Sequence, residues 1–199
     1  MLKELMEQIR AGEPVTREQA LSLYEEEPAA LSAAADTLRR EFCGSRFDMC
    51  TIVNGKSGQC SENCKFCAQS SHYQGEAETY SLLDGGTLLE QAQYNEAKGV
   101  LRFAVVTSGK RLSDRELEAV CGSYRLMHER TGIALCASHG LLGEEQLRRL
   151  KAAGVTRYHN NLESSRRYFP QVCTTHTYDE KIATIRAAQR AGLQVCSGG

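Results

Sequence analysis

Apolar residues recur along most of this chain in two alternating patterns. Stretches in which they lie three and four positions apart, typical of a helix with one buried face, are separated by short apolar runs, typical of buried strands. The runs predict strands over 48–55, 100–109, 133–140, 155–163 and 193–199, and the stretches between them predict helices over 87–99, 113–132, 144–154 and 177–192. The region is therefore expected to repeat a strand–helix unit.

Glycines and capping residues mark the ends of these helices. Each predicted helix ends in a glycine that leads into the next apolar run, as in "KGVL", "TGIA", "AGVT" and "AGLQ". Glycine readily adopts the left-handed conformation that ends helices. Thr87 with Glu90, and Ser113 with Glu116, have the spacing of a capping box at a helix start. Strands that alternate with helices form right-handed βαβ units and a parallel sheet, so the predicted fold class is α/β.

Two parallel architectures fit this order, an open doubly wound sheet and part of a (β/α)8 barrel of the TIM type. No G-x-G-x-x-G sequence follows the first strand, which disfavours a dinucleotide-binding sheet. The last predicted strand runs into "CSGG" with no helix after it, and an uncovered parallel edge promotes association. We expect the sequence to hold the N-terminal part of a longer barrel, with about the first five strands.

The first 44 residues differ from the rest and predict a separate helical segment, with the barrel portion spanning 45–199. Thr16 and Gln19 have capping-box spacing. After Pro28, apolar residues recur at helical spacing and stop at Gly44. The sequence therefore predicts helices ahead of the first strand.

Composition and charge limit the partners and the compartment. Of 199 residues, 24 are basic and 25 acidic, so nothing predicts a nucleic-acid or membrane surface. No apolar run approaches the length that spans a bilayer, and the charged N-terminus does not resemble a signal peptide. We expect a cytoplasmic protein, in which nine cysteines indicate metal binding or catalysis rather than disulfides. Cys50 and Cys121, in apolar surroundings, are interpreted as core thiols.

Three cysteines are concentrated in "CSENCKFCAQSSHY", where Cys60, Cys64 and Cys67 form C-x3-C-x2-C. A closed zinc site needs four ligands, and His72 could be the fourth. Ferredoxin-type clusters use C-x2-C-x2-C and a fourth cysteine, which the three-residue gap here does not match. The remaining interpretation is a [4Fe-4S] cluster on three thiolates, with one iron open for an exchangeable ligand.

This spacing resembles that of the radical S-adenosylmethionine (SAM) enzymes. Together with "RYHNNLESSRRYFP", "TTHTYDEKIATI" and "AGLQVCSGG", the loop resembles the biotin synthase family over roughly residues 40–199. The resemblance implies a radical SAM barrel in which Cys60, Cys64 and Cys67 hold a [4Fe-4S] cluster and SAM binds the open iron. It further implies radical insertion of sulfur into dethiobiotin to form biotin, a homodimer, and a reducing electron donor protein.

The resemblance also assigns residues outside the loop. Asn161 and Glu163, in "HNNLE" after the fourth predicted strand, match an Asn-x-Asp pair that contacts substrate and the SAM ribose, with glutamate in place of aspartate. Phe66 matches an aromatic position beside the cluster. The carboxyl ends of barrel strands are where active sites form. We therefore expect Asn161 and Glu163 to bind the cofactor; a strand-end turn is the alternative interpretation.

A second, auxiliary cluster is implied as the sulfur donor, and here the sequence departs from the family. Cys136 and Cys196 match the ligands of strands three and five, but Ala104 stands where strand two has a cysteine. Alanine cannot ligate iron. We expect an auxiliary cluster, [2Fe-2S] or of a different nuclearity, on Cys136 and Cys196 with help from Cys173 and Cys43; both of the latter could instead be buried thiols.

Two other functions stay open at this point. Another radical SAM barrel, such as a methylornithine or hydrogenase-cofactor enzyme, would share the cysteine triplet, and a zinc-binding or electron-transfer module would need no catalysis. Cys136, Cys196 and "HNNLE" favour the biotin synthase family. Arg102, in an apolar strand, needs an anionic partner, while His139 and His159 are interpreted as polar packing residues.

Overall fold

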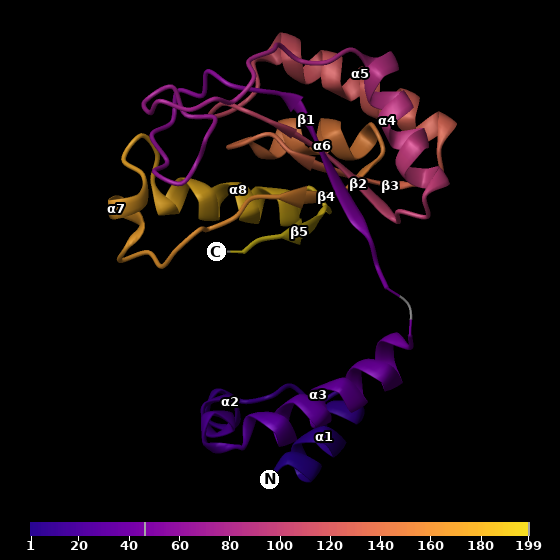
Figure 1. The fold of residues 1–199 in the computed structure, drawn as a ribbon, viewed down its shortest axis with the longest axis vertical. Coiled ribbons are helices and arrows are strands. Elements are labelled where there is room, and N and C mark those ends of the chain that lie inside the picture. The colour runs from indigo at the N-terminus through magenta and orange to yellow at the C-terminus, as the bar shows by residue number, and fades with distance from the viewer. Residues whose placement is uncertain (46, 199) are drawn as a thin grey trace. The chain divides into compact units, whose positions relative to one another are not determined.

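A computed structural model describes residues 1–45 and 47–198 and divides the chain into two compact units, Met1–Phe47 and Asp48–Gly199 (Figure 1). The smaller unit is helical. It contains α1 (Leu2–Arg10), α2 (Arg17–Ser22), the 3-10 turn η1 (Leu23–Glu25) and α3 (Pro28–Cys43). The capping box that opens α2 and the end of α3 at Gly44 are as predicted.

The larger unit alternates strands with helices, as the sequence predicts. Its strands are β1 (Cys50–Lys56), β2 (Arg102–Thr107), β3 (Ala134–Ser138), β4 (Val155–His159) and β5 (Gln194–Cys196). Its helices are α4 (Gly85–Ala97), α5 (Asp114–Arg130), α6 (Glu144–Ala152), α7 (Phe169–Val172) and α8 (Tyr178–Arg190). All neighbouring strands are parallel, and their order in the sheet is β1-β2-β3-β4-β5.

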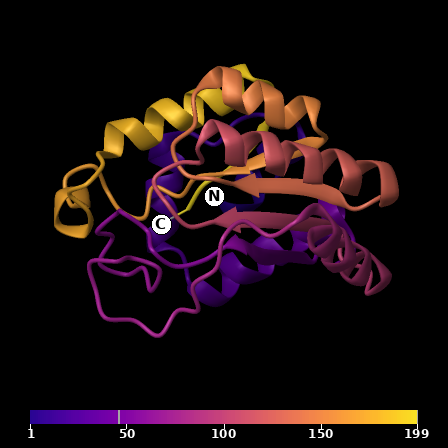
Figure 2. The ribbon, with the colours of Figure 1, turned by 90° about the horizontal axis from the view of Figure 1, so that it is seen from above.

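This order decides between the two predicted architectures. In a doubly wound sheet the strand order reverses at a switch point. Here each strand lies beside its predecessor, as in a (β/α)8 barrel. The helices pack along one face of the sheet, as Figures 1 and 2 show. The opposite face, called the inner face below, is the one that lines the interior of a barrel.

Strand side chains alternate between these two faces. Phe103, Val105, Leu135 and Tyr158 point toward the helices and belong to the buried core. The residues that alternate with these point to the inner face. There, five residues are paired one after another across the sheet: Ile52, Ala104, Cys136, Arg157 and Gln194. The inner face therefore carries thiol and guanidinium groups, whereas the helix side is apolar.

The structure corrects two sequence interpretations and adds a short helix that was not predicted. Helix α4 begins at Gly85, because the Asp84 carboxylate accepts from Thr87 N; Thr87 is not the cap. The two glycines in this first turn concealed the start. The short helix α7 has too few residues to show a period. Cys50 is not a core thiol, because it is exposed on the inner face of β1, whereas Cys121 is buried as predicted.

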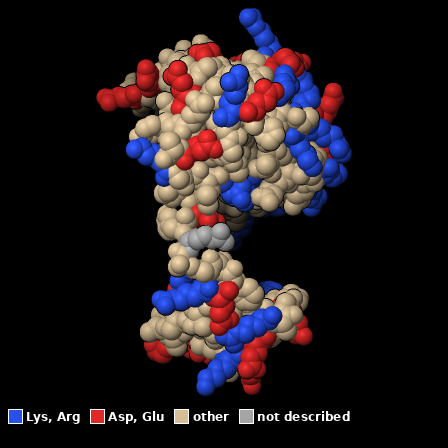
Figure 3. Space-filling model, turned by 90° about the vertical axis from the view of Figure 1, so that its right-hand side faces the viewer, with Lys and Arg blue, Asp and Glu red and all other residues tan. Residues whose placement is uncertain are grey.

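No described helix is both long enough and apolar enough to cross a membrane. On the face shown in Figure 3, basic and acidic side chains are interspersed, in keeping with the net charge of −1.

Candidate metal centre

The cysteine triplet lies in the loop between β1 and α4, at the carboxyl end of the parallel strands. The loop folds back on itself: Cys60 N donates to the Gln69 carbonyl at 2.9 Å, and Ser71 N donates to the Cys60 carbonyl at 2.9 Å. All three thiols line one cavity of about 210 Å³. The structure thus brings Cys60, Cys64 and Cys67 together, as the spacing predicts.

A glycine makes this tight loop possible. Gly58 has φ +74°, and a Cβ there would collide with Thr79. Its N–H donates to the Gln69 side chain at 2.7 Å. The loop therefore starts with a backbone conformation and a close approach that favour glycine.

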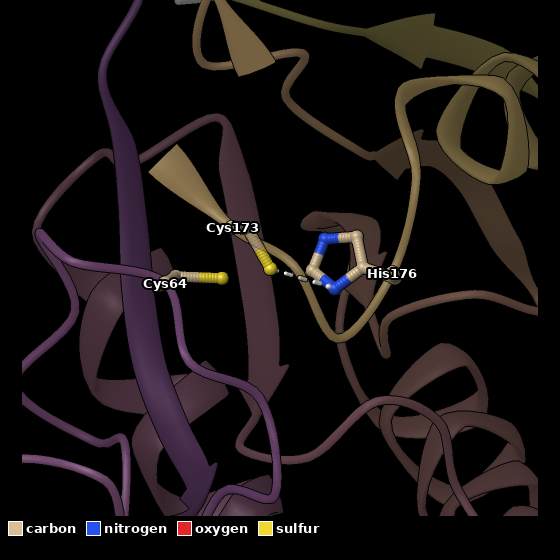
Figure 4. A group of neighbouring side chains, drawn as sticks. All are labelled: Cys64, Cys173 and His176. Atoms are coloured by element: carbon tan, nitrogen blue, oxygen red, sulfur yellow. Dashed lines mark hydrogen bonds between the residues drawn. The ribbon is translucent and has the colours of Figure 1, made fainter. Parts of the chain in front are cut away.

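Cys173 lies against the cysteine loop between β1 and α4. The Sγ atoms of Cys64 and Cys173 and a ring nitrogen of His176 all lie within 4.8 Å of one another (Figure 4). Cys173 Sγ is 3.3 Å from His176 Nδ1, and it donates to Asn63 Oδ1 at 3.3 Å. Two thiols and an imidazole at such distances could hold a single transition-metal ion. From the sequence, Cys173 was expected to help Cys136 and Cys196 hold the auxiliary cluster. In the structure it lies beside Cys64 and His176 instead.

Electrostatics in this group distinguish the two thiols. Burial, and then the neighbouring Cys173, raise the pKa of Cys64 to about 12. Burial opposes ionisation of Cys173 as well, but hydrogen bonds from Thr175 and from the backbone of His176 outweigh it and lower the pKa of Cys173. Cys173 is therefore the more acidic thiol of the pair.

A buried carboxylate fixes the imidazole. His176 Nδ1 donates to Glu62 Oε2 at 2.6 Å, and Thr175 donates to the same oxygen at 2.9 Å. Burial would raise the pKa of Glu62, but these hydrogen bonds outweigh it and lower the pKa. His72, the zinc ligand considered from sequence, is exposed and its Nε2 lies 3.0 Å from the Ser61 carbonyl. His72 is not part of this donor group.

The carboxyl ends of β2 and β4 form the opposite wall of the cavity. Glu163 lines it and has φ +65°, and Lys181 beside it donates to the Asn161 carbonyl at 2.7 Å. Asn161 itself is exposed and lines a second, adjoining cavity. The predicted pair thus lies at the strand ends near the thiol loop.

Asn160, which sequence reasoning missed, lines both cavities. Its side chain is 8% exposed, and Nδ2 is buried with no hydrogen-bond partner among the described atoms. A buried amide donor without a partner is unfavourable, so its place in the cavity wall fits a ligand that carries an acceptor oxygen. Phe66 also lines the first cavity and is exposed.

A buried polar network lies behind this wall. His139 is fully buried; its Nδ1 is 3.0 Å from Thr107 Oγ1, and its Nε2 is 3.0 Å from the Tyr124 hydroxyl. Tyr124 donates to the Cys136 carbonyl, so its oxygen accepts from His139 Nε2, and Nδ1 accepts from Thr107. Burial lowers the pKa of His139 to about 3. As predicted, His139 packs as a neutral polar residue.

The residues expected at the auxiliary cluster are only partly together. Cys136 and Cys196 both lie on the inner face, Cys136 buried and Cys196 exposed. Cys43 is exposed at the end of α3, in the other unit. Arg102 is half-buried on the inner face, two residues before Ala104. His159 Nε2 is buried without a hydrogen-bond partner among the described atoms.

Comparison with known proteins places this geometry in a family. The model of the radical SAM superfamily matches residues 56–199. The chain belongs to the radical SAM superfamily. Membership implies a [4Fe-4S] cluster and SAM, and the three clustered thiols with the unpartnered Asn160 amide fit these two groups.

Curated relatives narrow the resemblance. The chain is 54% identical over 199 residues to biotin synthase of Akkermansia muciniphila, covering all of this chain and 62% of that protein. It is 51% identical over 199 residues to biotin synthase of Clostridium botulinum (strain Alaska E43 / Type E3), of which it covers 63%. The chain thus spans about three fifths of the length of these curated relatives.

Solved radical SAM structures share the fold. Methylornithine synthase superposes with a TM-score of 0.79 at 17% identity, covering 98% of this chain and 58% of that one. HydG, a maturase of the [FeFe]-hydrogenase, superposes with a TM-score of 0.78 at 18% identity, covering 99% and 45%. At these identities the likeness establishes the α/β architecture of the radical SAM barrel.

Proposed function

We propose that this protein is a biotin synthase, a radical SAM enzyme that inserts sulfur into dethiobiotin to form biotin. The observation that carries the proposal is the 54% identity to biotin synthase of Akkermansia muciniphila over the whole chain. The thiols of the inner face support it, because sulfur insertion needs a sulfur donor and thiols there could hold an iron–sulfur cluster that supplies it.

The residues divide into three roles. Cys60, Cys64 and Cys67 hold the [4Fe-4S] cluster, which when bound supplies the electron that cleaves SAM to a 5′-deoxyadenosyl radical. Asn161 and Glu163 contact the cofactor at the strand ends. The Glu163 carboxylate lines both cavities, where it can accept hydrogen bonds from hydroxyl groups of the ligand.

Further parts of the proposal concern the assembly. The auxiliary iron–sulfur cluster lies on the inner face with Cys136 and Cys196 among its ligands. The protein works as a homodimer in the cytoplasm and receives electrons from a reducing electron donor protein. On the face that Figure 3 shows, acidic and basic side chains are interspersed, and the proposed substrate is a small molecule.

An anaerobic activity assay tests the proposal. The protein is reconstituted with iron and sulfide and given SAM, dethiobiotin and dithionite, and biotin and 5′-deoxyadenosine are measured by mass spectrometry. We expect both products from the parent protein, both from the Cys121→Ser control, and neither from Cys64→Ala. Cys121 is a buried helix thiol away from the cavities.

Two results would overturn the assignment in different ways. Formation of 5′-deoxyadenosine without biotin would indicate another radical SAM reaction. A colourless protein that binds stoichiometric zinc, and shows no broad absorption near ~400 nm after reconstitution, would indicate a zinc module instead.

A further inference from the structure

Cys50 lies on the same inner face of the sheet as Cys136 and Cys196. Register pairs join Ile52 to Ala104 and Ala104 to Cys136, and Cys50 precedes Ile52 by two residues. Because side chains two residues apart on a strand share a face, Cys50 points to the side of Cys136. Its thiol is exposed on this face.

Barrel geometry places these three thiols in one layer. In a (β/α)8 barrel the register shifts by about one residue per strand, and each interior layer is built from alternate strands. Cys50 lies two residues before the register partner of Cys136 in β1, and Cys196 lies two residues after its partner in β5. Both offsets are two residues in the same direction along the strands, which is the shift expected between strands two apart in the barrel. The odd strands β1, β3 and β5 therefore contribute one thiol each to a common level.

The even strands contribute positive charge next to this layer. Arg102 is the register partner of Cys50 in β2, and Arg157 is the register partner of Cys136 in β4. Among the ion pairs of residues 1–45 and 47–198, neither guanidinium has a carboxylate partner. Two guanidinium groups beside three thiols provide counter-charge for an anionic ligand.

The nearest neighbours of Cys136 agree with this placement. On β2, the register partner of Cys136 is Ala104, whose side chain is a single methyl group. The other thiol considered for this role within the unit, Cys173, lies beside Cys64.

We propose that Cys50, Cys136 and Cys196 are the thiolate ligands of the auxiliary iron–sulfur cluster, with Cys50 replacing the thiol that Ala104 lacks. This inference rests on the proposed function, which requires an auxiliary cluster. Thiolates are the usual ligands of iron–sulfur clusters, and Arg102 and Arg157 offset the negative charge that three thiolates and sulfide bring.

Metal content tests the proposal independently of activity. The parent for the test is the Cys60→Ala/Cys64→Ala/Cys67→Ala protein, which lacks the first cluster, reconstituted anaerobically with iron and sulfide. We expect it to keep the iron and sulfide of one auxiliary cluster per chain, with the Mössbauer spectrum of an iron–sulfur cluster. Adding Cys50→Ser should remove most of both. Adding Cys121→Ser instead, as a matched control, should remove neither.

A rescue variant separates ligation from folding. Ala104→Cys returns a thiol to the second strand, so in the Cys50→Ser background it should restore the iron and sulfide. If Cys50→Ser retains full iron, or if His159→Ala loses it while Cys50→Ser does not, Cys50 is not the ligand and the proposed function stands. If the parent of the test binds no iron while far-UV circular dichroism shows it folded, there is no auxiliary cluster, and the proposed function fails as well.

Discussion

The buried histidine behind the cavity makes a quantitative prediction about pH. Burial lowers the pKa of His139 to about 3, whereas a histidine in the unfolded chain has a pKa of about 6.5. Below pH 6.5 the unfolded chain binds a proton that the folded chain cannot accept, so this group stabilises the fold above pH 6.5 and loses its contribution as the pH falls. Between pH 7.5 and pH 5 the loss is about 2 kcal/mol.

The substitution His139→Gln removes this titration. At pH 7.5 it also disturbs the hydrogen bonds to Thr107 and Tyr124, both 3.0 Å long and fully buried, at a cost of about 2 kcal/mol. The variant should therefore be less stable than the parent at pH 7.5 and nearly equal to it at pH 5. The two free energies of unfolding approach each other because only the parent has a histidine that takes up a proton on unfolding in acid.

Equilibrium urea unfolding at pH 7.5, 6 and 5, followed by far-UV circular dichroism, measures the effect. The cluster-free protein is used under reducing, anaerobic conditions, so that release of metal in acid does not contribute. His128→Gln, at an exposed position of α5, is the matched control and should follow the parent at every pH. If the parent and His139→Gln lose the same stability between pH 7.5 and 5, His139 is not held neutral and the reasoning is refuted.

Three further substitutions have defined outcomes. Gly140→Ala should destabilise the protein by more than ~1 kcal/mol in urea unfolding, because Gly140 has φ +72° and a Cβ there would collide with backbone. Cys173→Val should leave the iron content of the first cluster unchanged, because Cys173 lies beside Cys64 but is not one of the three proposed ligands; loss of iron would make Cys173 a ligand. Lys56→Met should cost about 1 kcal/mol at pH 7 and weaken the loss of stability between pH 4.5 and 2, because Lys56 helps hold the pKa of Glu116 near 2, against its burial.

The repeating elements were predictable because local signals mark them. Helix caps such as Ser113 with Glu116 and Thr177 with Glu180 occur where the structure has helix starts. Left-handed glycines follow α4, α6 and α8 as predicted, whereas α5 ends earlier, with Thr131 as its C-cap. The alternation of strands and helices fits both a barrel and a doubly wound sheet, and the prediction of a barrel came from the missing G-x-G-x-x-G sequence and from the family resemblance. Strand order, which depends on contacts between distant segments, resolved this.

The main limit on predicting the site was that the sequence does not show which strand side chains point into the barrel. Strands of a parallel sheet are apolar on both faces, so the sequence does not show which of two alternating sets points inward. Cys50 was assigned to the core for this reason. Asn160 was missed because β4 ends at His159, and beyond the strand the alternation of side chains no longer tells which of Asn160 and Asn161 faces the cavity. The hydrogen bond from Lys181 to the Asn161 carbonyl helps fix the backbone there.

The long-range position of Cys173 had no sequence signal. Asn63 Oδ1 accepts from Thr174 N at 2.9 Å and from Thr175 N at 3.2 Å, and these contacts hold the segment after α7 against the cysteine loop. More than one hundred residues separate the two segments in the chain. Such a contact forms only when the strands and helices between the two segments have packed together, and no local sequence pattern predicts it.

Moving a ligand from β2 to β1 has a structural consequence for the proposed auxiliary site. Ala104 lies one level nearer the carboxyl ends of the strands than the layer of Cys50, Cys136 and Cys196, whereas Arg102 and Arg157 lie one level nearer the amino ends. The Cys50 thiol therefore lies about 3 Å, the rise of one strand residue, nearer the level of the two guanidinium groups than a thiol at position 104 would. Under the proposal, the thiol that replaces the one missing at Ala104 would hold an anionic cluster closer to the two groups that offset its charge.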